Sequence, residues 1–166
     1  MAQKIIIIIL VLFSSLNLYS QKDNRVSFNL DSIIKEGIIF KCPYIVTDMG
    51  GKRLIGNAKD SVELISKFLK KHSNWIFEFS NHTDERGDSR HNIALSEKFV
   101  LYVGNMLFNE YSISKEQLKL KGYGESILLI PTKKIAAAKS QNEKEYLHSL
   151  NRRYELKVLK KDSLNN

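Results

Sequence analysis

The chain of 166 residues contains a single cysteine, Cys42, so no disulfide can form within the molecule. Its stability must therefore come from packing. It also lacks an apolar run of the ~20 residues that a membrane-spanning helix needs. No internal repeat is present, and the length suits one domain with a sizeable core.

The longest apolar run, residues 5–13, follows Lys4 and ends in a polar, serine-containing stretch. This layout is typical of a secretory signal peptide. Cleavage after Ser20 would remove residues 1–20, and without a cysteine near that point a lipid anchor is disfavoured. An uncleaved inner-membrane anchor is the alternative.

The sequence has 26 lysines and arginines against 18 acidic residues, a formal net charge of +8. A basic protein outside the cytoplasm meets acidic wall polymers and lipid headgroups before it meets nucleic acid. The simpler interpretation is that the charge keeps the domain soluble. Export argues against nucleic-acid binding, and the aromatic residues Trp75, Phe77 and Phe79 lie on an expected core strand rather than on an exposed basic platform.

Apolar periodicity predicts strands separated by helices, and hence one mixed sheet with helices packed on it. Residues 21–36 are expected to be a lead-in or an early edge strand. The expected strands are 38–40, 75–79, 118–121 and 154–159, with a polar loop at 80–89 and a turn at 122–124. Helices are expected from about residue 57 or 60 to 71, from about 92 to 109, and near 143–150.

A strand passes into a loop rich in potential ligand-binding groups at residues 81–88. Ten residues separate Asp84 from Leu95, and apolar side chains continue the following helix at four-residue spacing. The pattern resembles the OmpA-like signature, which is Thr-Asp, ten residues, Leu-Ser, two residues, Arg-Ala, two residues, Val, three residues, Leu. The matching residues are Thr83, Asp84, Leu95, Ser96, Val103 and Leu107.

Two further motifs extend this resemblance along the chain. Residues 121–126 are similar to the family's Gly-x-Gly-Glu-Ser turn, and residues 151–155 to its closing Asn-Arg-Arg-x-Glu motif. The resemblance is to the OmpA C-terminal-like, peptidoglycan-associated domain family. It implies a domain at 37–160, a tail at 161–166, and an α/β (α+β) sandwich of β-α-β-α-β type with helices packed on one face of the sheet.

In that family the ligand is the peptide stem of peptidoglycan, typically its diaminopimelate residue, whose free end carries an ammonium and a carboxylate. The resemblance implies that Asp84, beside Thr83, accepts the ammonium. Asn92 would hydrogen-bond the ligand where exposed N–H groups at a helix start favour an anion. Arg152 or Arg153 would add positive charge at the rim. The alternative for Asp84 is a loop or capping carboxylate.

The family's carboxylate-binding arginine is replaced here by Phe99, and the following alanine by Val100. Loss of a desolvated arginine–carboxylate pair costs about 2–5 kcal/mol, which puts the ligand affinity in doubt. Asn81 also replaces a glycine and adds bulk. The cations that could compensate are Arg86 and Arg90 in the loop and, less favourably, Lys98. The ring at position 99 is expected to join the core or to stack on a sugar or an aromatic partner.

A metal-binding or catalytic alternative rests on His82, Asp84, Asp88 and His91. Their spacing lacks the helical or strand pattern of common metal sites, and the wider motif explains the first two without a metal. We therefore expect a non-enzymatic binding domain with no cofactor or metal, in the periplasm and associated with the outer membrane. The second hypothesis keeps the fold and makes the domain a protein-interaction module of an envelope complex.

Overall fold

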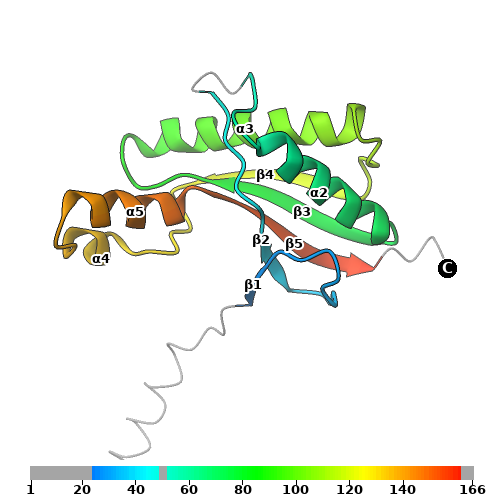
Figure 1. The fold of residues 1–166 in the computed structure, drawn as a ribbon, viewed down its shortest axis with the longest axis horizontal. Coiled ribbons are helices and arrows are strands. Elements are labelled where there is room, and N and C mark those ends of the chain that lie inside the picture. Colours follow the sequence, from blue (N-terminus) through cyan, green and yellow to red (C-terminus); the bar gives the residue numbers. More distant parts are fainter. Residues whose placement is uncertain (1–23, 49–51, 162–166) are drawn as a thin grey trace, which may run out of the picture.

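The computed structural model describes residues 24–48 and 52–161 of the chain (Figure 1). Within these residues the strands are β1 (Arg25–Ser27), β2 (Ile39–Lys41), β3 (Trp75–His82), β4 (Leu118–Gly124) and β5 (Arg153–Lys161). The helices are α2 (Ala58–Lys71), α3 (Ser89–Asn109), α4 (Thr132–Ala136) and α5 (Gln141–Asn151).

The five strands form one mixed sheet in the order β1-β2-β5-β3-β4. The pairs β1/β2 and β3/β4 are parallel, while β5 runs antiparallel to both β2 and β3. The last strand therefore inserts between two parallel pairs. This confirms the expected mixed sheet.

The core lies between one face of the sheet and helices α2 and α3. Apolar side chains of α2 recur at three- and four-residue spacing, which gives the helix one buried stripe. Alternate residues of β3 and β5 point toward that stripe. The residues buried there include Val62, Ile65, Phe68, Val103, Leu107, Phe77, Phe79, Leu156 and Val158. Helices α4 and α5 lie together at one end of the sheet (Figure 1).

Several boundaries differ from those expected. Strand β3 continues through the polar residues 80–82, because β4 and β5 supply backbone partners on both sides of it. Helix α3 begins at Ser89 rather than near Asn92, because the Asp88 side chain caps it. The expected turn at 122–124 is the end of β4, and α4 was not expected.

The expected lead-in contributes to the packed structure. It contains the edge strand β1, and the Phe28 ring lies 4.9 Å from that of Phe68. At the other end, Lys161 belongs to β5. The proposed signal peptide, residues 1–20, and most of the expected tail lie outside the described residues. Within the described ranges, no helix combines the length and the apolar character needed to cross a membrane.

Candidate functional site

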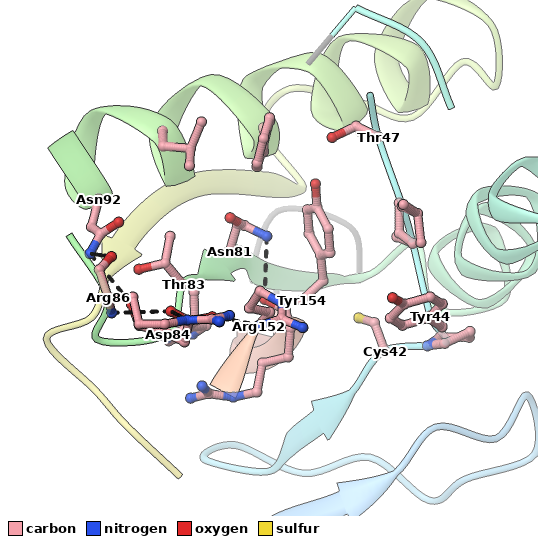
Figure 2. Close-up of a pocket in the computed structure, with 17 residues that line it drawn as sticks. Cys42, Tyr44, Thr47, Asn81, Thr83, Asp84, Arg86, Asn92, Arg152 and Tyr154 are labelled. Atoms are coloured by element: carbon pink, nitrogen blue, oxygen red, sulfur yellow. Dashed lines mark hydrogen bonds and ion pairs between the residues drawn. The ribbon is translucent and has the colours of Figure 1, made fainter. Parts of the chain in front are cut away.

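A pocket of about 330 Å³ opens beside the C-terminal end of β3, where the Thr-Asp motif leaves the sheet (Figure 2). Its walls come from the segment after β2, from α3 and from the start of β5. All five residues expected to bind ligand line the pocket, namely Thr83, Asp84, Asn92, Arg152 and Arg153. Segments more than 60 residues apart in the sequence thus meet at one cavity.

Asp84 lies at the charged end of this pocket between two arginines (Figure 2). Its Oδ1 accepts from Arg86 Nε at 3.0 Å, and its Oδ2 accepts from Arg86 Nη2 at 2.7 Å and from Arg152 Nη1 at 2.6 Å. The Asp84 side chain is only 8% exposed, whereas those of Arg86 and Arg152 are 50% and 40% exposed. The carboxylate is therefore fixed, and both cations lie at the mouth.

The two arginines also share a second carboxylate, Glu145 on α5. Arg86 Nη1 and Arg152 Nη2 each donate to Glu145 at 2.8 Å. Burial alone would raise the pKa of Asp84, but the hydrogen bonds from Arg86 and Arg152 outweigh it and lower the pKa from 3.8 to about 2. Asp84 is thus ionised at neutral pH.

Asn92 lines the pocket, and its side-chain amide is bonded to the loop that carries Asp84. Its Nδ2 donates to the carbonyl oxygen of Arg86 at 3.1 Å and also contacts the Glu125 carboxylate. The expectation of an open anion site at the helix start is wrong, because Asp88 Oδ1 accepts from the backbone N–H groups of Arg90 and His91, each at 3.1 Å. Asn92 and Asp88 therefore position the loop that carries Asp84.

Arg153 does not lie at the rim as expected. The residue is 5% exposed, and its Nε donates to Glu155 at 2.7 Å. Strand alternation puts Arg153 and Glu155 on the sheet face opposite to Tyr154. His82 joins them there, with Nε2 3.4 Å from Glu155. Of the two neighbouring arginines, Arg152 is the one whose charged group reaches the pocket mouth.

Phe99 packs partly against the core and also lines the pocket. The ring does not fill the cavity, which keeps its volume of about 330 Å³ beside Asp84. The lining also includes the uncharged residues Cys42, Ile45 and Leu95. The pocket therefore has a charged end at Asp84 and an uncharged part that Phe99 lines.

Of the three cations considered as substitutes for the missing arginine, Arg86 alone among them lines the pocket in the described part of the chain. Arg90 is 95% exposed and lies 3.9 Å from Asp88. Lys98 is exposed on α3. Arg152 was predicted only as positive charge at the rim, and its contact with Asp84 was not predicted. Glu145 was not predicted because no motif includes it.

Several polar pocket groups have no hydrogen-bond partner among the described residues. They are Asn81 Oδ1, Thr83 Oγ1, the Tyr154 hydroxyl and His82 Nδ1, the last on a ring whose other nitrogen lies against Glu155. From the sequence, Asn81 was expected only to add bulk and Tyr154 only to belong to a strand. The alternation of side chains along β5 directs Tyr154 toward the core. Only the register between β3 and β5 brings it opposite Asn81.

The residues of the metal hypothesis do not form one cluster. His82 lies against Glu155 on the opposite sheet face, Asp88 caps α3, and His91 is exposed. A different group, Asp84 with Glu85 and His148, has potential ligand atoms within 4.8 Å of one another. Asp84 is already paired with Arg86 and Arg152, and a metal ion bound by this group would have to displace both guanidinium groups.

The fold is similar to that of several solved cell-envelope domains. The peptidoglycan-associated lipoprotein of Burkholderia pseudomallei aligns with a TM-score of 0.53 and 19% identity over 69% of this chain and 87% of its own. The periplasmic domain of Helicobacter pylori MotB gives 0.57 and 19% over 78% and 86%. The cell wall anchor of the T6SS from Pseudomonas aeruginosa gives 0.53 and 16% over 70% and 76%.

No curated protein matches the chain in sequence. The profile of the OmpA family matches residues 48–145, from just after β2 into α5, and so includes β3, α3 and β4 with the Thr-Asp motif between them. This span is more than half of the chain, it contains two of the three motifs, and it agrees with the fold. The chain belongs to the OmpA family.

Proposed function

We propose that the chain is a non-catalytic, exported binding domain that holds peptidoglycan by the charged end of its stem peptide, of the diaminopimelate type. The observation that carries the proposal is the Asp84 carboxylate, which is fixed in the wall of an open pocket and ionised at neutral pH. Such a group receives an ammonium with a charge-assisted hydrogen bond. Thr83 beside it adds a hydroxyl without a partner in the described structure.

The arginines at the mouth supply the positive charge that the pocket lacks because Phe99 replaces the family's arginine. Arg86 and Arg152 have half-exposed guanidinium groups, and exposed ion pairs contribute only about 0–1 kcal/mol. Either can therefore turn from Asp84 or Glu145 toward another carboxylate of the stem peptide, such as that of its γ-linked glutamate. The ammonium then takes the position that the guanidinium leaves.

The basic charge of the chain suits this location. A net charge of +8 favours residence beside the acidic polymers of the cell envelope. We place the processed protein in the periplasm, in association with the outer membrane. Its role there is to attach or position an envelope component, with no reaction catalysed.

The second candidate is a protein-interaction module that no longer binds the wall. One observation favours it, namely that both oxygens of Asp84 already accept hydrogen bonds from arginines of the same chain. An incoming ammonium must displace at least one of these bonds. In this alternative the cluster of Asp84, Arg86, Arg152 and Glu145 stabilises the fold.

Co-sedimentation with insoluble peptidoglycan sacculi separates the two. The protein would be purified after export from cells that express the full chain. The wild type is expected in the pellet, and Asp84→Asn in the supernatant. Asp31→Asn is the matched control, because it makes the same change of charge at a side chain that is 84% exposed and bonded to Lys71 outside the pocket.

A wild type that stays in the supernatant while Phe99→Arg pellets would establish the interaction module instead. A wild type and an Asp84→Asn variant that pellet equally would contradict the proposed role of Asp84. The Asp31→Asn control shows whether loss of any one acidic group changes the retention of this basic protein.

A further inference from the structure

Away from Asp84, in the part of the pocket here called the inner half, buried polar groups of Asn81, Thr83 and Tyr154 have no hydrogen-bond partner in the described residues. Asn81, Thr83 and Tyr154 are 5%, 8% and 5% exposed, and the atoms concerned are Oδ1, Oγ1 and the phenol oxygen. Buried polar atoms in folded proteins are almost always paired. These three line one open cavity, where a polar group of a ligand can pair with them.

The hydrogen-bonding character of these groups is defined by their other contacts. Asn81 Nδ2 donates to the carbonyl oxygen of Arg153 at 3.3 Å, which leaves Oδ1 as an acceptor. Burial raises the pKa of Tyr154, so its hydroxyl is protonated at neutral pH and can donate. The subsite therefore offers one acceptor and hydroxyl groups that can donate.

These groups lie together in the pocket. Asn81 and Tyr154 are directly paired across β3 and β5, and Thr83 follows Asn81 by two residues. Figure 2 shows the Asn81 amide between Thr83 and the Tyr154 ring. A single small group can therefore contact more than one of them.

No cation serves this half of the pocket in the part of the chain that the structure describes. Arg86 and Arg152 lie at the mouth with Asp84 and Glu145, and Arg153 directs its guanidinium to Glu155 on the other sheet face. The remaining lining is uncharged and includes Phe99. A carboxylate placed there would lose its hydration without gaining a charge partner.

We propose that this inner half, formed by Asn81, Tyr154 and Phe99, is a subsite for an uncharged carboxamide. The domain then prefers stem peptides in which the diaminopimelate carboxylate beside the free ammonium is amidated. A carboxamide presents N–H groups to Asn81 Oδ1 and a carbonyl oxygen to the Tyr154 hydroxyl. A carboxylate cannot donate to Asn81. The inference rests on the proposed function, because it assumes that the ammonium of the same ligand lies at Asp84.

The test is calorimetric titration of the processed protein with two synthetic stem tripeptides of the sequence alanine-γ-glutamate-diaminopimelate. In one the diaminopimelate carboxylate beside the free ammonium is free, and in the other it is amidated. The wild type is expected to bind the amidated peptide at least about tenfold more tightly. Phe99→Arg should reverse the preference, since it supplies a guanidinium to the inner half.

Tyr154→Phe provides a variant that removes no hydrogen bond of the described fold. It should reduce the preference for the amide, and Tyr111→Phe, outside the pocket, should keep it. Equal or tighter binding of the free acid by the wild type would overturn the inference and leave the proposed function intact. Absence of binding to both peptides would overturn both.

A preference for the amide that Phe99→Arg and Tyr154→Phe both leave unchanged would also overturn the inference. The discrimination would then arise outside the subsite formed by Asn81, Tyr154 and Phe99. Circular dichroism of each variant shows whether a lost preference reflects a lost fold.

Discussion

At Asp84, burial and two guanidinium groups act in opposite directions on one carboxylate, and the guanidinium groups prevail. The residue is anchored by Arg86 from its own loop and by Arg152 from the junction of α5 and β5. Its charge therefore both stabilises the fold and defines one end of the pocket. The two roles can be separated because stability and binding are measured independently.

Asp84→Asn is expected to lower the free energy of unfolding by about 1–2 kcal/mol at neutral pH, because a neutral amide bonds the guanidinium groups less strongly. A carboxyl whose folded pKa is depressed stabilises fully above its ordinary pKa of 3.8 and loses that effect as the pH falls to about 2. The difference between wild type and variant should thus shrink over this interval. Urea unfolding at several pH values measures it, and a constant difference would contradict the assignment.

The sequence was sufficient to predict the loop residues of the site but not the groups that meet them. Thr83 and Asp84 follow from the motif, and Arg86 is close enough in sequence to be considered. The contact of Arg152 with Asp84 spans 68 residues and depends on where β5 inserts in the sheet. The burial of Arg153 depends on the strand starting one residue earlier than expected, which turns its side chain to the opposite face.

At the scale of elements, α3 lies unusually close to β4 because glycines occupy the contact. A methyl group on Gly122 would overlap the backbone nitrogen of Glu97 and lie 2.7 Å from its Cα. A methyl group on Gly104 would instead overlap the end of the Leu120 side chain. The Gly-x-Gly part of the motif at 121–126 is thus explained by helix packing.

Gly122→Ala is expected to cost about 3 kcal/mol, since the obstacle is backbone that cannot move without shifting α3. Gly104→Ala should cost about 1 kcal/mol or less, because a side-chain end can rotate away and alanine favours the helix. Thermal or denaturant unfolding of both variants gives the comparison. Equal costs would contradict the close backbone approach of α3 and β4.

Boundaries of elements were less predictable than their order. Polarity suggested that β3 ends at Phe79, but a central strand with partners on both sides continues regardless of which side chains it carries. Asn151 shows the same limit. It was expected only as part of a motif, and it is fully buried with its side chain bonded to both backbone groups of Ile130.

At the scale of the whole molecule, the order of strands and helices predicted the mixed sheet, and the three motifs predicted the family. Local periodicity supplies element types, and the spacing of three motifs supplies their arrangement. Neither contains the sheet order β1-β2-β5-β3-β4, in which the last strand, β5, lies between β2 and β3. The pocket lies where these distant segments converge, so its uncharged inner half was not predictable.

The proposed export makes a prediction about residues 1–20. The protein isolated from its native envelope should have the mass of residues 21–166, because the apolar run at 5–13 has the length and flanks of a cleaved signal peptide. Intact-protein mass spectrometry measures this directly. A mass that includes residues 1–20 would indicate the uncleaved anchor.

The central claim is that a stem peptide binds beside Asp84, and nuclear magnetic resonance locates such binding by residue. Titration of the isotope-labelled, processed protein with soluble stem peptides released from sacculi should shift the amide resonances of Thr83, Asp84, Arg86 and Arg152, in a saturable manner that Asp84→Asn abolishes. Shifts confined to other surfaces, or the same saturable shifts in Asp84→Asn, would contradict the account.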